Sequence, residues 1–243
     1  MTQKLPVTVL TGFLGSGKTT VLARLLKNPQ LKDTAIIVNE FGEVGLDHDL
    51  LQRTDEDLIL LANGCVCCTV RGDLVEAFHK LEAQRLAGAS FDRVIIETTG
   101  LADPAPILHT LMSDESVTAH YRLAQVITTL DAVNAMATLD QHPEAVKQAA
   151  VADRILLTKT DISRAEGVVA LRARIATLNP AAPVVLSLNG EVSVDDFFGD
   201  AGFDITGKTA SVQDWLRIEA YEPGHDHHHA HDHDHHGHHH HEE

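Results

Sequence analysis

Residues 12–19 read Gly-Phe-Leu-Gly-Ser-Gly-Lys-Thr and follow an apolar run, Val7–Leu10, that is suited to a buried strand. Spaced glycines followed by Lys18 and Thr19 form the pattern of a phosphate-binding loop, in which backbone N–H groups point at phosphate oxygens. Lys18 is expected to reach the β and γ phosphates, and the Thr19 hydroxyl is expected to ligate Mg²⁺. A glycine-rich turn before an ordinary helix is the alternative. The strand before the loop and the helix-forming stretch 21–27 after it favour the phosphate site.

Apolar, β-branched runs recur along the chain and alternate with stretches of helical character, such as 73–86 and 165–178. Continuous apolar strands separated by helices indicate a mostly parallel sheet with helices on both faces. We therefore expect an α/β fold of the phosphate-loop NTPase class, with ligands at the carboxyl ends of the strands. The expected strands are Val7–Leu10, Ala35–Val38, Leu58–Leu61, Val94–Ile96, Val126–Ile127, Ile155–Leu157 and Val184–Leu186.

Composition limits the size of the core and the class of partner. A chain of 243 residues, 44% of them hydrophobic, can bury one full α/β core. The net charge of −16 argues against a nucleic-acid partner, because such binding needs clustered Lys and Arg. The few residues before the loop are too short for a signal peptide, and no apolar run approaches the ~18 residues of a membrane span. We expect a soluble, cytoplasmic protein without a membrane partner.

An acidic motif follows the strand that is expected at 94–96. It reads Glu97-Thr98-Thr99-Gly100. A carboxylate at the tip of a strand beside a phosphate loop is placed to hold Mg²⁺, directly or through water. The following Gly100 allows a backbone N–H to approach the γ-phosphate. The motif is weak alone, but its place downstream of a phosphate loop predicts Thr19 and Glu97 as the magnesium side of the site.

The base-reading element is Thr158-Lys159-Thr160-Asp161, again at the end of an apolar strand. The Asp161 carboxylate matches the N1–H and N2–H donors of guanine, whereas adenine presents an acceptor at N1, so the motif predicts GTP rather than ATP. By analogy with other base contacts, such a pair contributes roughly 1–3 kcal/mol of discrimination. The Lys159 stem is expected to cover the base. A polar turn is the alternative. The stretch 187–189, which begins with Ser187, is expected to add a backbone contact to the base.

All three cysteines fall within four positions, at Cys65, Cys67 and Cys68. They cannot form a disulfide framework, and three neighbouring thiols can converge on one soft cation. Zn²⁺ is the commonest ion at such thiolate sites in a reducing compartment, and Co²⁺ also fits. Small buried hydrophobes or a redox pair are the alternatives. Three ligands leave a fourth position open, which suits delivery of a metal better than a closed structural site.

An acidic, glycine-containing loop, Asn39-Glu40-Phe41-Gly42-Glu43-Val44-Gly45, follows the second expected strand. In a phosphate-loop GTPase this is the place of the first switch, which the γ-phosphate and Mg²⁺ order. Glu40 and Glu43 are candidates to orient water, to join Mg²⁺ or to add a ligand to the thiolate site. A solvated acidic loop is the alternative for each of them.

The composition changes abruptly after Tyr221. Residues 225–241 contain twelve His, mixed with Asp, Gly and Ala. A segment of this composition has no core to bury, so we expect it to be disordered without a ligand. An expression tag is the alternative, but His alternates with Asp and Gly, which favours a native segment that collects metal. We predict a main domain over 1–220 and a tail over 221–243. The secondary metal ligands expected in the tail are His225, His227, His228, His229, His231, His233, His235, His236, His238, His239, His240 and His241.

Taken together, these motifs resemble the CobW-type GTPase family of zinc and cobalt metallochaperones, in the SIMIBI class of phosphate-loop GTPases. Their order and spacing agree over roughly residues 5 to 220. The resemblance implies a GTPase related to the nickel-insertion GTPases of urease and hydrogenase maturation, with metal bound at the cysteine motif and handed to a client enzyme. Members often carry a His-rich stretch and usually continue into a small C-terminal domain, whereas this sequence ends at Glu243. Thr158 stands where other GTPases carry Asn.

The expected function is therefore GTP hydrolysis coupled to binding of Zn²⁺ or Co²⁺ and its delivery, with GTP, Mg²⁺ and the metal as cofactors. Lys18, Glu40 and Glu97 are the expected catalytic groups. A client metalloenzyme is the expected partner, and a homodimer is left open. A metal-storage protein with incidental nucleotide binding and a small-molecule kinase are the alternatives. The expected GTP contacts are Gly12, Gly15, Ser16, Gly17, Lys18, Thr19, Thr20, Gly100, Lys159, Asp161 and Ser187.

Overall fold

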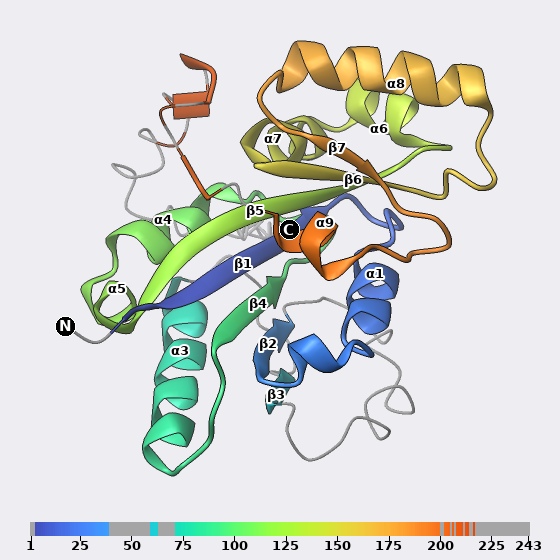
Figure 1. Cartoon of the computed structure of the whole chain (residues 1–243). Helices are drawn as coiled ribbons and strands as arrows, with labels where there is room; N and C mark the ends of the chain where they lie inside the picture. The colour runs from blue at the N-terminus through green and yellow to red at the C-terminus, as the bar shows by residue number, and fades with distance from the viewer. Residues whose placement is uncertain are drawn as a thin grey trace, which may run out of the picture.

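The computed structural model describes residues 3–38, 59–62 and 71–199, and of the remainder 202–204, 206, 208–210, 212–213 and 216. The strands in this part of the chain form one seven-stranded parallel sheet in the order β3-β2-β4-β1-β5-β6-β7 (Figure 1). The predicted α/β fold is confirmed, and each expected strand is present. The strands are β1 (Leu5–Gly12), β2 (Thr34–Val38), β3 (Ile59–Ala62), β4 (Arg93–Glu97), β5 (Tyr121–Asp131), β6 (Arg154–Thr158) and β7 (Val184–Leu186).

Helices cover both faces of the sheet. Two helices begin at side-chain caps: Asp114 accepts from the N–H groups of Ser116 and Val117, and Ser193 accepts from the N–H of Asp196. The α-helices are α1 (Lys18–Leu25), α3 (Arg71–Leu86), α4 (Ala105–Ser113), α5 (Glu115–His120), α6 (Ala135–Gln141), α7 (Pro143–Val151), α8 (Ala165–Leu178) and α9 (Val194–Phe198), and a short 3₁₀ turn spans Pro29–Leu31.

The core consists of three apolar clusters. One packs β1, β2 and β4 against α3, α4 and α5, and another packs β5 and β6 against α6, α7 and α8. The third joins α1 and α9 to the opposite face of the sheet. On β4, Val94 and Ile96 point into the first cluster and Ile95 into the third, and all three are fully buried. Burial from both sides explains why these strands read as continuous rather than alternating apolar runs.

The strand register brings the motifs to one edge of the sheet. Leu10 at the end of β1 is level with Glu97 of β4, and Gly12 is level with Thr129 of β5. Asp131 at the end of β5 is in turn level with Thr158 of β6. The carboxyl ends of β4, β1, β5 and β6 therefore meet around the phosphate loop.

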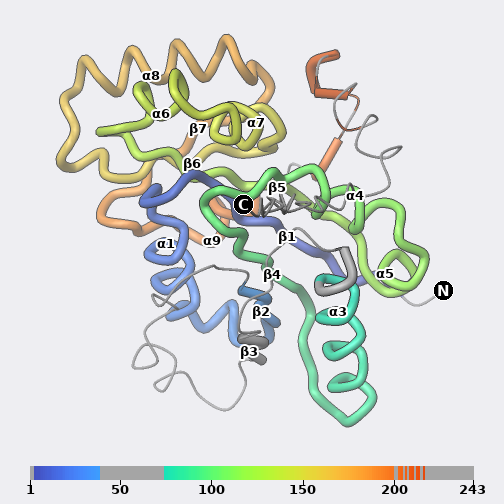
Figure 2. The backbone as a smooth tube through the Cα atoms, turned by 180° about the vertical axis from the view of Figure 1, so that it is seen from behind, coloured from blue at the N-terminus to red at the C-terminus, as the bar shows by residue number. Residues whose placement is uncertain are grey.

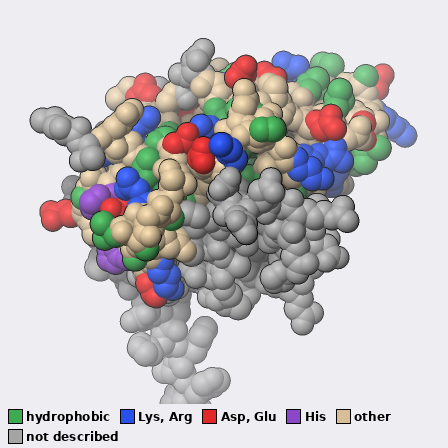
Figure 3. All heavy atoms as spheres, turned by 60° about the horizontal axis from the view of Figure 1, so that its bottom comes forward, with side chains coloured by type: hydrophobic (Ala, Val, Ile, Leu, Met, Phe, Trp, Pro, Cys, Tyr) green, Lys and Arg blue, Asp and Glu red, His purple; other side chains and the backbone are tan. Residues whose placement is uncertain are grey.

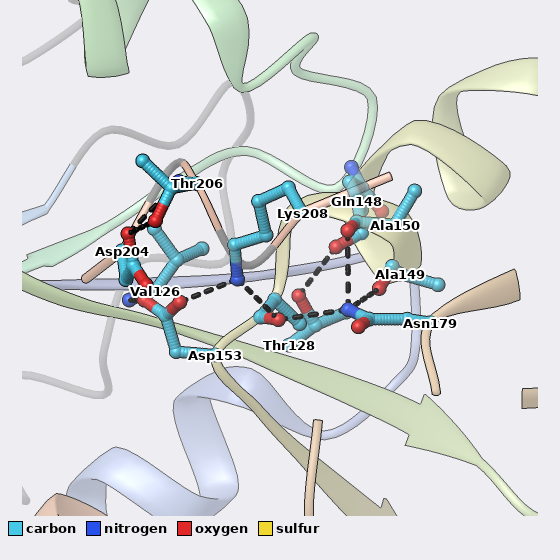
Figure 4. A network of polar contacts seen from close by, with 11 residues as sticks. Val126, Thr128, Gln148, Ala149, Ala150, Asp153, Asn179, Asp204, Thr206 and Lys208 are labelled. Carbon is cyan, nitrogen blue, oxygen red and sulfur yellow. Dashed lines mark hydrogen bonds and ion pairs between the residues drawn. The ribbon is translucent and has the colours of Figure 1, made fainter. Parts of the chain in front are cut away.

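The last described residues return to the sheet. Phe203 donates its N–H to Ala124 O at 2.6 Å, and Val212 and Leu216 join the cluster beneath α3 and α4. The buried Lys208 ammonium donates to Ala152 O at 2.8 Å and pairs with the Asp153 carboxylate (Figure 4). These contacts fasten this part of the chain to the start of β6.

Two surface features bear on partners. No described helix has both the length and the hydropathy that crossing a membrane requires. On the face drawn in Figure 3, Lys and Arg side chains are interspersed with Asp and Glu rather than gathered into one positive surface. The start of β1 lies beside the end of α5 in both ribbon views, since Leu5 pairs with Tyr121 (Figures 1 and 2).

Candidate functional site

The phosphate loop connects β1 to α1 through residues with left-handed backbone. Gly15 has a φ of 70° and Gly17 a φ of 92°, values that glycine adopts without steric cost. The Ser16 N–H donates back to Phe13 O at 3.1 Å and closes the turn. Lys18 is 4% exposed, and its ammonium donates to Gly12 O at 3.0 Å and Phe13 O at 3.4 Å. The loop therefore curls around a buried positive charge at the amino end of a helix, where anions bind favourably.

Gly12 is packed too closely for any side chain. A Cβ at this position would lie 2.3 Å from Thr129 Oγ1 and 2.8 Å from Ser16 Oγ. Those two hydroxyls form a hydrogen bond of 2.6 Å, and Thr129 Oγ1 also lies 3.3 Å from its acceptor, Thr11 O. The loop is thus fastened to β5 by a buried pair of hydroxyls.

Glu97 ends β4 beside the first turn of α1. It is fully buried, and its Oε1 accepts a hydrogen bond of 2.5 Å from Thr19 Oγ1. A hydroxyl and a carboxylate are hard oxygen ligands of the kind that Mg²⁺ binds, so the residues present fit this ion. The structure brings the two predicted magnesium ligands together, and their role as ligands stays a prediction.

The segment after Glu97 lies directly against the phosphate loop. The Thr98 N–H donates to Leu10 O at 3.0 Å, and the Thr98 hydroxyl donates to Thr11 Oγ1 at 2.8 Å. A Cβ on Gly100 would lie 2.6 Å from the backbone N of Leu14. Only glycine permits this approach, so the backbone of Gly100 forms one wall of the loop.

The predicted base reader, at the end of β6, is joined to the same loop. Thr158 Oγ1 donates to Ser16 O at 2.7 Å, so this hydroxyl connects the end of β6 to the phosphate loop. Lys159 has a left-handed backbone with φ 57°, and its ammonium donates to Asp131 Oδ2 at 2.7 Å. Asp161, three residues after the end of β6, is exposed to solvent, and its pairing with a base stays a prediction.

The electrostatics at the end of β5 favour an ionised Asp131. Burial alone would raise the pKa of this carboxyl, but hydrogen bonds from Lys159, the Asn134 amide and the Val133 N–H outweigh burial and hold the pKa below its usual value. The carboxylate in turn keeps the Lys159 stem beside the loop. An ion pair thus fixes the side chain that was predicted to cover the base.

The end of β7 completes the base side. The Ser187 N–H donates to Leu157 O at 2.8 Å within the sheet, so this N–H is already used. The Ser187 hydroxyl is fully buried, and its oxygen has no hydrogen-bond partner among the described residues. Gly190 lies against α1, where its Cβ would be 2.9 Å from Thr20 Cγ2. Ser187 O also accepts from the Thr160 hydroxyl at 3.4 Å, so Ser187 contacts the base reader while Thr20 contacts the loop that follows β7.

A pocket of about 230 Å³ lies between the phosphate loop and the ends of β5 and β6. Its lining combines the first half of the loop with the ion pair between Lys159 and Asp131, whereas Lys18, Thr19, Glu97 and Asp161 are not among its lining residues. The lining residues are Phe13, Leu14, Gly15, Ser16, Thr129, Leu130, Asp131, Asn134, Ala135, Thr138 and Lys159.

Several predicted residues lie outside the described part of the chain. They are Glu40 and Glu43, the cysteines Cys65, Cys67 and Cys68, and the histidines of 225–241. Among the residues that the structure does describe, no group of three or more His, Cys, Asp or Glu side chains is arranged to hold a metal ion. The metal site proposed from the sequence therefore rests on the sequence pattern alone.

Sequence reasoning missed the support that β5 gives to the site. Thr129 contacts the loop, Asp131 contacts Lys159 and Asn134 contacts Asp131, yet none of the three belongs to a motif. The available signal was positional, because polar residues at the carboxyl end of a strand next to β1 are expected at the ligand edge. Gln148 was also missed, because one amide in a helical stretch has no informative spacing.

Comparisons with known proteins agree with this geometry. A family model described as CobW/HypB/UreG, nucleotide-binding domain, matches residues 6–186, which include the phosphate loop, Glu97 and the base reader. The zinc chaperone YjiA of Escherichia coli (strain K12) is 40% identical over 209 residues, which are 85% of this chain and 65% of that protein.

A further relative and a crystal structure of YjiA extend the comparison. The zinc-regulated GTPase metalloprotein activator 1 of Schizosaccharomyces pombe is 34% identical over 194 residues, or 77% of this chain and 46% of that protein. The crystal structure of Zn(II)-bound YjiA GTPase from E. coli matches with a TM-score of 0.63 at 34% identity, over 83% of this chain and 63% of the other. The chain thus spans between about half and two thirds of the length of these relatives.

Proposed function

The chain belongs to the CobW/HypB/UreG family of nucleotide-binding domains, and on that premise we propose that it is a GTPase that binds zinc and passes it to a client metalloprotein. The names of its relatives, a zinc chaperone and a zinc-regulated GTPase activator, support both parts of the proposal. The proposal includes a cytoplasmic location, because the three cysteine thiols must stay reduced to bind metal.

One observation carries the nucleotide part. The Thr19 hydroxyl and the buried Glu97 carboxylate lie 2.5 Å apart, next to the buried ammonium of Lys18. A cation and two hard oxygen ligands at the end of a phosphate loop are the parts that phosphoryl transfer to water requires. Mg²⁺ held by Thr19 and Glu97 would supply positive charge to the phosphates.

The chain's own groups then have defined tasks. Lys18 and the loop N–H groups would bind the β and γ phosphate oxygens and neutralise charge, without a covalent intermediate on the protein. The exposed Asp161 would pair with the two donors of guanine. Glu40 is the candidate to orient the attacking water, because it lies in the segment 39–45, which takes the place of the first switch in a phosphate-loop GTPase.

Zinc is the cargo in this proposal rather than a resident cofactor. Thiolates of Cys65, Cys67 and Cys68 would bind it, with Glu40 or Glu43 as a further ligand and one position left for a ligand of the client. Cobalt would fit the same donor set. The His-rich segment would raise the local metal concentration, and a homodimer is compatible with this scheme.

Release of phosphate from GTP tests the nucleotide part. Lys18→Ala should abolish turnover while the variant stays folded, because no other described cation lies inside the loop. The matched control is Lys27→Ala, which removes the same charge from an exposed position just beyond the end of α1. It should leave turnover unchanged.

Two results would contradict the proposal. Retained turnover in Lys18→Ala would place hydrolysis elsewhere. Stoichiometric binding of several metal ions by a wild-type protein that releases no phosphate from GTP would identify a storage protein.

A further inference from the structure

Gln148, on α7, makes contacts that the proposed chemistry does not account for. Its side chain is fully buried, and its Nε2 donates hydrogen bonds to Gly100 O at 3.2 Å and to Ala102 O at 3.0 Å. Both acceptors belong to the segment that follows Glu97. One amide therefore holds two carbonyls of the loop that contacts the phosphate loop.

The orientation of this amide is fixed by its neighbours. Carbonyl oxygens only accept hydrogen bonds, so the nitrogen rather than the oxygen of Gln148 must face Gly100 and Ala102. The Oε1 atom is buried and finds no donor among the described residues. A buried acceptor without a partner is destabilising, so an apolar residue of the same size would serve simple packing better. The two hydrogen bonds to the loop, rather than core stability, therefore explain why an amide occupies this position.

The helix that carries Gln148 is firmly anchored. Thr128 Oγ1 donates to Gln148 O at 2.7 Å, and the Asn179 amide donates to Ala149 O, Ala150 O and Ala152 O at 2.8–3.1 Å (Figure 4). Lys208 holds the same end of α7 through Ala152 O. Gln148 thus extends from a fixed support, and its hydrogen bonds transmit that rigidity to the loop.

A neighbouring residue reinforces this grip. Lys147 pairs with the Asp103 carboxylate, whose Oδ1 also accepts from the Ala105 N–H at the start of α4. Two successive residues of α7 therefore hold the segment 100–103. On the phosphate-loop side, Gly100 has no space to move toward Leu14. The backbone of Gly100 is confined between the phosphate loop and Gln148.

We propose that Gln148 is a positioning residue that fixes the Gly100 backbone for the γ-phosphate and thereby sets the preference for GTP over GDP. The inference rests on the proposed function, because it requires a nucleotide in the phosphate loop. GDP has no γ-phosphate, so loosening the Gly100 segment should weaken binding of GTP and leave GDP binding unchanged. Hydrolysis of GTP should also slow, because a displaced Gly100 backbone would position the γ-phosphate less well.

Gln148→Met tests this proposal, because it keeps the side-chain length and removes both donors. We expect GTP affinity to fall roughly tenfold, as loss of two neutral hydrogen bonds implies, and GDP affinity to stay within about twofold of the wild type. The matched control is Gln213→Met, the same substitution at an amide that donates to Thr206 O and Lys208 O rather than to the loop. It should lower the melting temperature without changing the ratio of GTP to GDP affinity.

Gln148→Glu adds a readout that a merely structural role would not move. Burial and the two facing carbonyls should raise the pKa of the introduced carboxyl, so that it donates one hydrogen bond when protonated and repels the carbonyls when ionised. GTP preference, measured relative to the wild type at each pH, should recover as the pH falls from 8 to 6. This experiment decides the question even where Gln148→Met fails to fold.

The outcomes distinguish failure of the role proposed for Gln148 from failure of the proposed function. A wild-type ratio of GTP to GDP affinity in folded Gln148→Met, or a pH-independent ratio in Gln148→Glu, would overturn the role of Gln148 alone. Equal loss of GTP and GDP binding would also overturn it. A wild-type protein that binds no GTP would overturn the proposed function and this inference with it.

Discussion

The phosphate side and the base side of the site are built in different ways. On the phosphate side, Lys18 and Glu97 are buried, and the loop is held by the bond between Ser16 and Thr129. On the base side, Asp161 is exposed, and the Lys159 side chain is 39% exposed although it pairs with Asp131. The phosphate side is assembled by the fold, whereas the base side presents groups to solvent.

This difference follows from the tasks of the two sides. Binding a multiply charged phosphate needs several donors at fixed positions, and the fold fixes them by close packing of β1, β4 and β5. Reading a base needs one carboxylate in reach, which an exposed turn can offer. A change in the closely packed backbone of the phosphate side should therefore damage folding and binding together, and a change at the exposed Asp161 of the base side should alter selectivity alone.

Gly12→Ala should have the largest effect on the phosphate side. Its Cβ would lie 2.3 Å from Thr129 Oγ1, at a φ of 142°, so the backbone or β5 must move. We expect the free energy of unfolding to fall by about 2–3 kcal/mol and nucleotide binding to be lost. Chemical denaturation and nucleotide titration measure the two effects.

Gly167→Ala is the control for this change. Gly167 lies inside α8 with open space around its Cα, so alanine there should raise stability by about 0.5–1 kcal/mol. If Gly12→Ala behaves like the control, the close packing of the loop does not limit the site.

Asp161→Asn should alter selectivity without altering stability. The side chain is exposed, so unfolding should be unchanged. GTP binding should weaken by roughly ten- to a hundredfold, the range that loss of a bidentate base contact implies. Xanthosine triphosphate should bind better, because the amide can donate to the additional carbonyl of that base. Unchanged GTP affinity would remove Asp161 from the base site.

Asp131→Asn should have the smallest effect and a defined dependence on pH. The folded protein holds the pKa of Asp131 below its unfolded value, so the ionised carboxyl stabilises the fold above about pH 4 and this stability is lost as the pH falls through the folded value. At pH 7 the variant should lose about 1 kcal/mol or less. Once the pH is below the folded value the two proteins should converge, and a difference in stability that does not shrink on acidification would contradict the assignment.

The sequence predicted the fold well where apolar runs were continuous. The seven strands appeared because residues such as Ile95 are buried from both faces. β5 spans Tyr121–Asp131, much more than the predicted 126–127, because Arg122 and Gln125 interrupt its apolar pattern. α4 to α7 were not anticipated, since short helices between strands carry few periods of a hydrophobic pattern.

The site was predictable only where a motif marked it. Thr19 and Glu97, 78 positions apart, were expected to converge because parallel neighbouring strands end at one edge. The contacts of Gln148 were not predicted, because they depend on which loop lies opposite α7 in the folded chain. Packing between segments far apart in sequence leaves no local signal.

A GTPase that loads and releases zinc must couple nucleotide binding to zinc binding, and titration of zinc against a competing chelator measures this coupling. The titration is run with GTP and Mg²⁺, with GDP and Mg²⁺, and without nucleotide, on the wild type and on Cys67→Ser. We predict zinc affinity roughly 5- to 150-fold higher with GTP than with GDP, and linkage requires zinc to raise GTP affinity by the same factor. Cys67→Ser should lose the tight site and keep nucleotide binding. Equal zinc affinity in all three nucleotide states would contradict the account.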